Sequence, residues 1–327
     1  MSTRPVRTLA AAAVTALALV ALAACNNDDS SSAGDSSSSS SDASSSATSS
    51  AATSSSAPTD AGGGSSAGAP QVTVLDAGSD PKEQLLLDVP EGQVETSTLD
   101  MRIGTSLGGG ASTVKIPLTA TYVTTVEDVS DDKITASFEF KDIEAHLPAS
   151  AGGDAQDQVD QAFKSIEGLS GTIELTPSGA VTSTDFHLPA DAPPELSSTI
   201  DQLAGQTSQV AVPFPDEPVG QGATWQVETQ LGVAGVDTDQ TATYTLDSID
   251  GDDYAISVKI DQQIKGTSSG AGVSGTTSIS GSYEGTLASF AATSGSLSGG
   301  GTSTVTVGGQ TLDTKTTIDM DISTDVQ

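Results

Sequence analysis

Two short segments place a serine at the spacing that many hydrolases use for a nucleophile. Gly104-Thr105-Ser106-Leu107-Gly108 and Gly266-Thr267-Ser268-Ser269-Gly270 both fit G-x-S-x-G. A nucleophile elbow requires a buried strand before the serine and a helix after it. The first segment is expected in a glycine-rich hairpin loop, and the second lies in a Ser/Gly tract that no histidine follows. We interpret both as chance matches and predict no catalytic residue and no enzymatic activity.

Metal ligands and acid–base residues are the next chemistry to consider. The two histidines, His146 and His187, each end a predicted strand shortly before a proline. They could act as a pair, but we favour two unrelated surface histidines. The acidic turns at 128–132 and 247–253 could attract calcium, but they lack the D-x-[DN]-x-[DN]-G spacing with a distant glutamate. Asp and Gly are also the residues that hairpin turns require, so we predict no metal site and no cofactor.

The single cysteine, Cys25, is the most informative residue for chemistry. It follows Leu22-Ala23-Ala24, and an apolar run that begins after Arg4 and Arg7 ends there. The run is shorter than the roughly 20 residues that a membrane-spanning helix needs. The pattern resembles the signal peptide and lipobox of bacterial lipoprotein precursors. The alternative is an ordinary secretory signal in which the cysteine has no role.

The lipobox resemblance implies a location and an anchor. Residues 1–24 would be removed as a lipoprotein signal peptide, and Cys25 would become the lipidated first residue. Two acyl chains at one terminus give stable membrane attachment. We therefore expect the protein on the outer face of the cytoplasmic membrane, with its domain in the cell envelope.

Residues 25–70 are expected to form a tether. Positions 26–70 are almost wholly Ser, Ala, Thr, Gly and Asp, with almost nothing to bury. Such composition cannot offset the entropy of ordering a chain, so this region is predicted to be disordered. A random coil of about 45 residues has a root-mean-square span of roughly 35–40 Å. O-glycosylation of its serines and threonines is a further hypothesis.

The charge of the chain limits its partners. It has 43 acidic residues against 11 Lys and Arg, a net charge of −32. Nucleic acid binding requires clustered basic residues, so we exclude it. The same charge argues against the folded domain lying on an anionic bilayer. Solubility in an exposed location is the simplest interpretation.

From about Gln71 apolar and polar residues alternate, as in strands with one buried face. Because only one face is apolar, we expect an antiparallel sheet. The alternating runs cover 99–103, 114–122, 134–140, 225–231, 254–260 and 318–322. The sequence thus predicts a mainly β extracytoplasmic domain over 71–327.

Two segments show helical spacing instead. The apolar residues at this spacing are Val159, Ala162, Phe163 and Ile166 in the first segment and Leu196, Ile200 and Leu203 in the second. Asp154 is the expected N-cap of the first helix and Gly168 its terminator, while the second begins after Asp191 with two prolines. Both predicted helices are amphipathic, so each is expected to lie across an apolar sheet face.

The chain also shows signs of internal duplication. Thr119-Ala120-Thr121-Tyr122 recurs as Thr241-Ala242-Thr243-Tyr244, and an acidic turn follows each copy. Farther on, Gly171-Thr172-Ile173 matches Gly285-Thr286-Leu287. These ordered matches predict two β-meander repeats, at about 81–186 and 212–322, that complete one core.

The expected architecture is a long curved antiparallel sheet, half-barrel-like, with two helices in its concavity. This architecture resembles the LolA/LppX-type lipoprotein carriers. The serine-rich tether, and a Pro/Gly turn at 213–222 that leads into a strand starting at Trp225, resemble uncharacterised actinobacterial cell-surface lipoproteins.

Three functions remain open. The first is a membrane-anchored, non-enzymatic binding or envelope-associated role, whose sharper form is a carrier of lipid or another apolar ligand between sheet and helices. That form needs an apolar cavity of roughly 300 Å³ or more. The second is an acidic structural or interaction module that engages the cell wall or a protein. A hydrolase ranks last.

Overall fold

A computed structural model describes residues 71–107, 114–148, 153–164, 167–189, 212–233, 236–268 and 271–327. This part of the chain is mainly β, with a 12-stranded antiparallel sheet and one α-helix. No helix among the described residues is long and apolar enough to cross a membrane. The predicted signal peptide, Cys25 and the predicted tether lie outside the described residues.

The strands do not follow chain order within the sheet. Their order is β1-β7-β8-β9-β10-β11-β12-β2-β3-β4-β5-β6, so the last strand joins β11 to β2. The strands are β1 (Gln71–Asp76), β2 (Val94–Leu107), β3 (Val114–Val129), β4 (Ile134–Ala145), β5 (Ser170–Leu175), β6 (Val181–His187), β7 (Thr224–Val233), β8 (Val236–Asp250), β9 (Asp253–Ser268), β10 (Ala271–Thr286), β11 (Ser294–Val307) and β12 (Gln310–Val326).

The six predicted alternating runs are confirmed as parts of β2, β3, β4, β7, β9 and β12. One related expectation is wrong, because Ser106 lies within β2 and not in a hairpin loop. Alternation continues through Thr105 and Ser106, and β12 pairs with both residues. A strand thus runs through the first G-x-S-x-G segment, and β9 ends in the second.

The helix α1 (Gly153–Lys164) matches the first predicted helix. It begins before Asp154, so this residue lies in the first turn, where a carboxylate favours the helix dipole, and not at the N-cap. Val159 and Phe163 are buried against Ala145 of β4. The helix covers the part of β4 beyond Glu139, the last β4 residue paired with β5. The second predicted helix lies outside the described residues.

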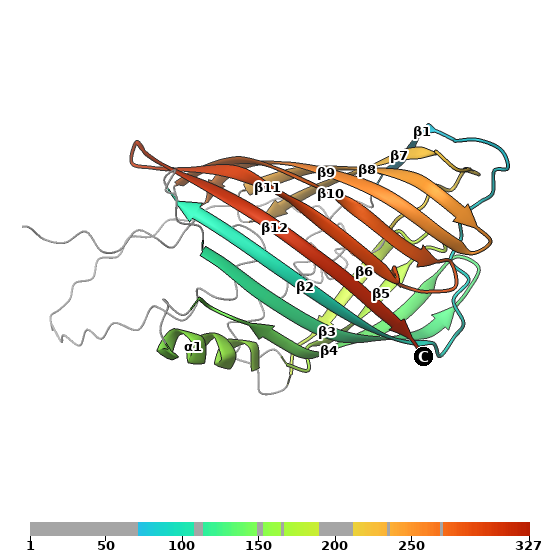
Figure 1. Cartoon of the computed structure of the whole chain (residues 1–327), viewed down its shortest axis with the longest axis horizontal. Helices are drawn as coiled ribbons and strands as arrows, with labels where there is room; N and C mark the ends of the chain where they lie inside the picture. The colour runs from blue at the N-terminus through green and yellow to red at the C-terminus, as the bar shows by residue number, and fades with distance from the viewer. Residues whose placement is uncertain are drawn as a thin grey trace, which may run out of the picture.

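The sheet curls along its strand order. In Figure 1 the yellow-green β5 and β6 lie behind the orange and red β10–β12. At one end of the molecule the β5–β6 turn meets the chain that precedes β7, where the Phe214 N–H donates to the Ser178 carbonyl oxygen at 2.7 Å. The two halves of the sheet thus approach each other at this end, which we call the closed end.

Residues 77–93, the closing segment, cross the closed end from one half of the sheet to the other. The Ser79 N–H donates to the Gln221 carbonyl oxygen at 2.9 Å, next to β7. The Leu87 N–H then donates to Pro177 in the β5–β6 turn at 2.8 Å, and the Asp88 N–H to Leu287 at 2.7 Å. The closing segment therefore ties together turns that are far apart in the chain.

The core lies under the closing segment. Leu85, fully buried, belongs to a cluster with Trp225 and residues of β8 and β9, while Val89 joins a second cluster formed by β3–β6. The Trp225 Nε1–H donates to the Pro213 carbonyl oxygen at 2.9 Å, and its ring stacks on Tyr244. Trp225 is therefore a core residue. We call the sheet face that carries these clusters the concave face.

Candidate functional site

Side chains on the concave face align in rows across the sheet because the strand register is regular. Residues paired across antiparallel strands point to the same face. The first row, which we call the isoleucine row, comprises Val72, Val227, Ala242, Ile260, Ile279, Gly299, Ile318, Ile103 and Ile116. Nine consecutive strands, β1 to β3 in sheet order, thus contribute no polar side chain to this row.

Two further apolar rows lie on the closed-end side of the isoleucine row. The second comprises Val74, Trp225, Tyr244, Val258, Gly281, Leu297, Met320, Met101, Leu118 and Ala145. The third comprises Leu246, Ile256, Tyr283, Gly295, Ile322, Leu99, Ala120 and Ile143. Successive rows lie about 7 Å apart along each strand.

The middle of this apolar face is not sealed by the described core. Ile103 and Ile318 are half-buried and belong to none of the three buried clusters formed by the described residues. Toward β3 and β4, α1 covers Leu118 and Ile143. Toward β7–β9 the core under the closing segment covers the rows. Met101 of the second row is 2% exposed, so the partly accessible apolar surface is centred on Ile103 and Ile318 of the isoleucine row.

Beside this surface, two glycines leave positions on the concave face of β10 and β11 without a side chain. Gly281 and Gly299 alternate with large residues across β10 and β11, because Gly281 faces Leu297 and Gly299 faces Ile279. A Cβ at Gly281 would lie 1.9 Å from the Ser296 carbonyl oxygen, and one at Gly299 2.2 Å from that of Ser278. Only glycine fits such close backbone approaches.

An aromatic group extends the concave face over β3–β6. Phe138 packs edge-on against Phe140, with ring centroids 6.2 Å apart, and against Phe186 at 5.2 Å. Tyr122 lies 5.7 Å from Phe140. Gly171 pairs with both Phe138 and Phe186, which leaves room for the Phe138 ring over its backbone.

Formal charge is segregated between the two faces. Among the strand residues that the structure describes, Glu95 is the only Asp, Glu, Lys or Arg on the concave face. Charged residues of β2 and β12, such as Arg102 and Asp321, alternate to the convex face and form an exposed ion pair at 3.7 Å. The concave face can therefore exclude water without burying unpaired charge.

Glu95 is fully buried at the closed end, where four donors satisfy its carboxylate. Gln93 Nε2 at 3.1 Å, Ser289 Oγ at 3.0 Å and the Phe290 N–H at 2.6 Å reach Oε1, while the Ala291 N–H reaches Oε2 at 3.1 Å. Burial raises the pKa of Glu95, and these hydrogen bonds oppose the shift. The carboxylate ties the β10–β11 turn to β2, which is a structural role.

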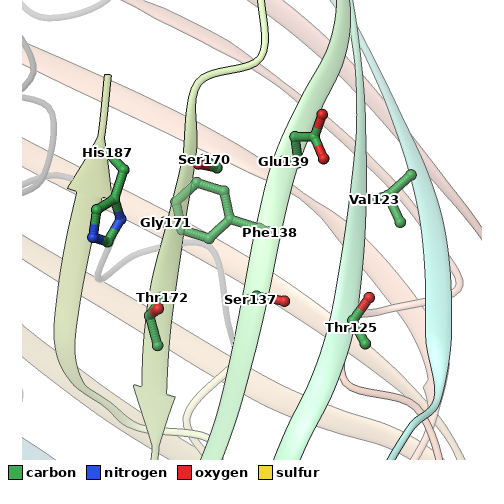
Figure 2. Close-up of a pocket in the computed structure, with 9 residues that line it drawn as sticks. All are labelled: Val123, Thr125, Ser137, Phe138, Glu139, Ser170, Gly171, Thr172 and His187. Carbon is green, nitrogen blue, oxygen red and sulfur yellow. The ribbon is translucent and has the colours of Figure 1, made fainter. Parts of the chain in front are cut away.

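A shallow depression of about 310 Å³ lies on the opposite, convex face (Figure 2). Thr125, Ser137 and Thr172 alternate with Val126, Ala136 and Ile173, which point into the core, so they face outward. The lining residues are Val123, Thr125, Ser137, Phe138, Glu139, Ser170, Gly171, Thr172 and His187. This depression is mostly polar and does not lie between sheet and helix.

Glu139, Ser170 and His187 form one cross-strand row in this depression. In a Ser-His-acid triad the histidine stands between serine and acid. Here Ser170 stands in the middle, so Glu139 and His187 lie two strands apart, at about 10 Å. Glu139 instead pairs with Lys141 at 2.6 Å. This row cannot work as such a triad, and the sequence did not single out Ser170.

The structure does not bring together the other candidates from the sequence. His146 is exposed just after β4, and its N–H donates to the Pro117 carbonyl oxygen at 3.0 Å, whereas His187 ends β6. The Asp247 carboxylate accepts from Ser257 across the β8–β9 pair. Within the described ranges, no three His, Cys, Asp or Glu residues are grouped so as to hold a metal ion.

Comparison with known proteins gives one partial match. Residues 196–294 match a family of unknown function, DUF6263. The matched segment contains all of β7, β8, β9 and β10 and the first residue of β11, which carry about two fifths of each apolar row. No curated protein matches the chain. The description of this family names no activity.

Proposed function

We propose that this protein is a membrane-anchored extracytoplasmic lipoprotein that binds an apolar ligand on the concave face of its sheet and has no enzymatic activity. The isoleucine row carries this proposal, because it continues past the buried core to the half-buried Ile103 and Ile318. Contiguous apolar surface of this kind in a protein of net charge −32 marks a binding site. Lipidation of Cys25 would hold this surface beside the membrane.

The curl of the sheet supports a carrier over a structural module. A flat sheet would leave the apolar rows open to water, whereas a curled one shields a ligand on several sides. The convex depression of about 310 Å³ reaches the size that a small-ligand site needs, but its polar lining does not suit an apolar ligand. The carrier form is expected to enclose an apolar cavity of that size between sheet and helices, whereas the proposal rests on the open apolar surface of the concave face.

Internal duplication of the β domain is also part of this proposal. Two matched turns support it. Gly92 before β2 and Gly222 before β7 have φ values of 81° and 83°. Their N–H groups donate to Val126 at 2.8 Å and Leu246 at 2.7 Å, and both acceptors return a hydrogen bond to the residue after the glycine.

Matched side chains support the duplication farther along. The Thr182 and Thr293 hydroxyls donate to the carbonyl oxygens of Glu174 and Glu284 at 3.2 and 3.0 Å. The matched turns equate position 126 with position 246. The repeated Thr-Ala-Thr-Tyr equates 122 with 244, and hence 126 with 248, so the two alignments differ by two residues. Each duplicated half of the sheet would then comprise six strands. One half is β1 with β7–β11, and the other is β12 with β2–β6.

Binding of a neutral apolar dye tests the proposal. The chain from residue 25 onward, carrying Cys25→Ser so that its own acyl chains do not interfere, is titrated with N-phenyl-1-naphthylamine. We expect saturable fluorescence enhancement with one site. Ile318→Asp should weaken binding by at least about tenfold, since it puts a charge beside the ligand. Asp319→Asn, next in β12 but on the convex face, should leave binding unchanged.

Ile318→Thr serves as the second variant because its branched side chain preserves the strand. It should weaken binding several-fold while the circular dichroism spectrum stays that of the parent. Absence of saturable dye binding by the parent chain would overturn the proposal. It would favour instead the alternative of an acidic interaction module that engages the envelope through its charged convex face.

A further inference from the structure

Beside the isoleucine row, two residues farther from the closed end, the seven strands from β7 to β2 in sheet order carry a band of polar side chains. This hydroxyl–amide band comprises Thr229, Gln240, Gln262, Thr277, Thr316 and Thr105. Gly301 of β11 interrupts the band, and Val114 of β3, the partner of Thr105, ends it. Every member carries a hydroxyl or an amide, and none carries a formal charge.

The band faces the same side as the apolar rows and is not a solvated rim. Thr229 and Gln240 are 8% and 6% exposed, and the Gln262 Nε2–H donates to Gln240 Oε1. One row beyond, Thr314 is 2% exposed and its Oγ1 has no hydrogen-bond partner. A buried hydroxyl without a partner costs about 1–3 kcal/mol, so it points to a group that is bound there.

Electrostatics restrict what that group can be. No Lys or Arg lies among the strand residues described on the concave face, so an anionic head group would find no counter-charge. The one carboxylate on this face, Glu95, lies at the closed end, and four donors occupy it. An ammonium group would therefore also be unpaired. Threonine and glutamine suit hydroxyl, ester or amide partners.

We propose that the ligand is an uncharged amphiphile whose apolar chains lie on the three apolar rows and whose hydroxyl or ester groups bind the hydroxyl–amide band. This inference rests on the proposed function and narrows it to one ligand class, the acylglycerols and other neutral lipids. The polar group would lie about 7 Å from the isoleucine row, so the chains would point toward the closed end.

Displacement of N-phenyl-1-naphthylamine from the Cys25→Ser chain tests the ligand class. The competitors are dioleoylglycerol, dioleoylphosphatidic acid, a dioleoyl trimethylammonium lipid and the hydrocarbon squalane. Salt of about 0.5 M screens the acidic convex face, so that long-range repulsion does not decide the result. We expect dioleoylglycerol to displace the dye at a concentration about tenfold or more below those of both charged lipids.

Gln240→Leu combined with Gln262→Leu tests the band itself. Replacing both partners of one hydrogen bond with apolar side chains of similar size preserves the fold. We expect this variant to lose most of the preference for dioleoylglycerol over squalane, about fivefold or more. Thr241→Val, on the convex face beside Gln240, should keep the parent preference.

The outcomes separate this inference from the proposed function. Equal or tighter binding of phosphatidic acid, an unchanged preference in the double variant, or dye binding that no lipid displaces would each overturn the neutral-amphiphile inference alone. Loss of dye binding in the parent chain would remove the proposed function as well.

Discussion

Ile103 of β2 and Ile318 of β12 are direct cross-strand partners, although they stand near opposite ends of the described chain. Their pairing joins the half of the sheet that ends at β6 to the half that ends at β1. Both side chains are half-buried on the concave face. The β12–β2 ladder that contains this pair thus joins the two halves of the sheet, and the pair lies at the centre of the proposed binding surface.

The position of this pair outside the core predicts a small effect on stability. Ile256→Ala, at a fully buried position, should lower the free energy of unfolding by about 2–5 kcal/mol. Ile103→Ala should lower it by less, about 1–2 kcal/mol, because its side chain is only partly buried. Urea denaturation followed by circular dichroism measures both. Equal losses would mean that Ile103 is packed as tightly as the core.

Trp225 should be difficult to replace even by another aromatic residue. Its ring stacks on Tyr244 with centroids 5.6 Å apart, and its Nε1–H satisfies the Pro213 carbonyl oxygen. Trp225→Phe removes that donor and leaves a cavity, so we expect a loss of about 2–3 kcal/mol. Since Trp225 is the only tryptophan, unfolding must be followed by circular dichroism. A loss below about 0.5 kcal/mol would show that the surrounding core refills the space.

Much of the fold could be predicted because alternation with large apolar residues marks six strands. β10 and β11 escaped prediction for a physical reason. Their concave face alternates glycine with isolated large residues, such as Ile279 and Leu297, so local hydrophobicity is low. Large side chains on the neighbouring strand lie beside each glycine, and this pairing becomes visible only when the strand register is known.

The candidate binding surface could not be predicted from the sequence. A row such as Gln240, Gln262 and Thr277 becomes visible only when β8, β9 and β10 are aligned. The insertion of β12 between β11 and β2 is equally hidden, because local patterns do not specify which strands pair. In contrast, the lipobox is a local motif, so the expectation for Cys25 needed no tertiary information.

Gly171 provides a test of close packing beneath the aromatic group. A Cβ at this position would lie 2.3 Å from the Asp185 carbonyl oxygen and 2.6 Å from Phe138 Cζ. Gly171→Ala should therefore destabilise the protein by about 1–3 kcal/mol. At Gly153 in α1 no atom lies within 4 Å of the added Cβ. Gly153→Ala is the matched control and should be neutral or stabilising by up to about 1 kcal/mol. Thermal unfolding of both variants measures these effects. Equal changes in stability for Gly171→Ala and Gly153→Ala would contradict the close packing at Gly171.

Cys25→Ser should abolish acylation and removal of the signal peptide. The thiol is the only group at this position that can accept a diacylglyceryl chain, and a serine hydroxyl is not a substrate for the same transfer. We expect wild-type protein in the membrane fraction, extractable by detergent, and unprocessed Cys25→Ser protein that carries no acyl chain by intact-mass analysis. Unchanged maturation and acyl content in Cys25→Ser would contradict the lipoprotein assignment. Asn26→Ser is the neighbouring control and should be acylated like the wild type.

Glu95 should make the stability of the protein depend on pH in an unusual direction for a carboxylate. Burial raises its folded-state pKa above the ordinary value of 4.5. Between the two values the folded state therefore binds more protons than the unfolded state, so the contribution of Glu95 to stability falls as pH rises. It is fully present below about pH 4.5 and is lost as pH rises through the folded-state pKa.

Comparison with Glu95→Gln isolates this contribution from the other carboxylates. The variant should be less stable at every pH by about 1–3 kcal/mol, because its amide would face the Phe290 and Ala291 N–H groups. The gap between wild type and variant should widen as pH falls from 7 toward 4.5, as measured by urea denaturation at each pH. A gap that narrows on acidification would mean that the four hydrogen bonds outweigh burial and hold the pKa of Glu95 below its ordinary value.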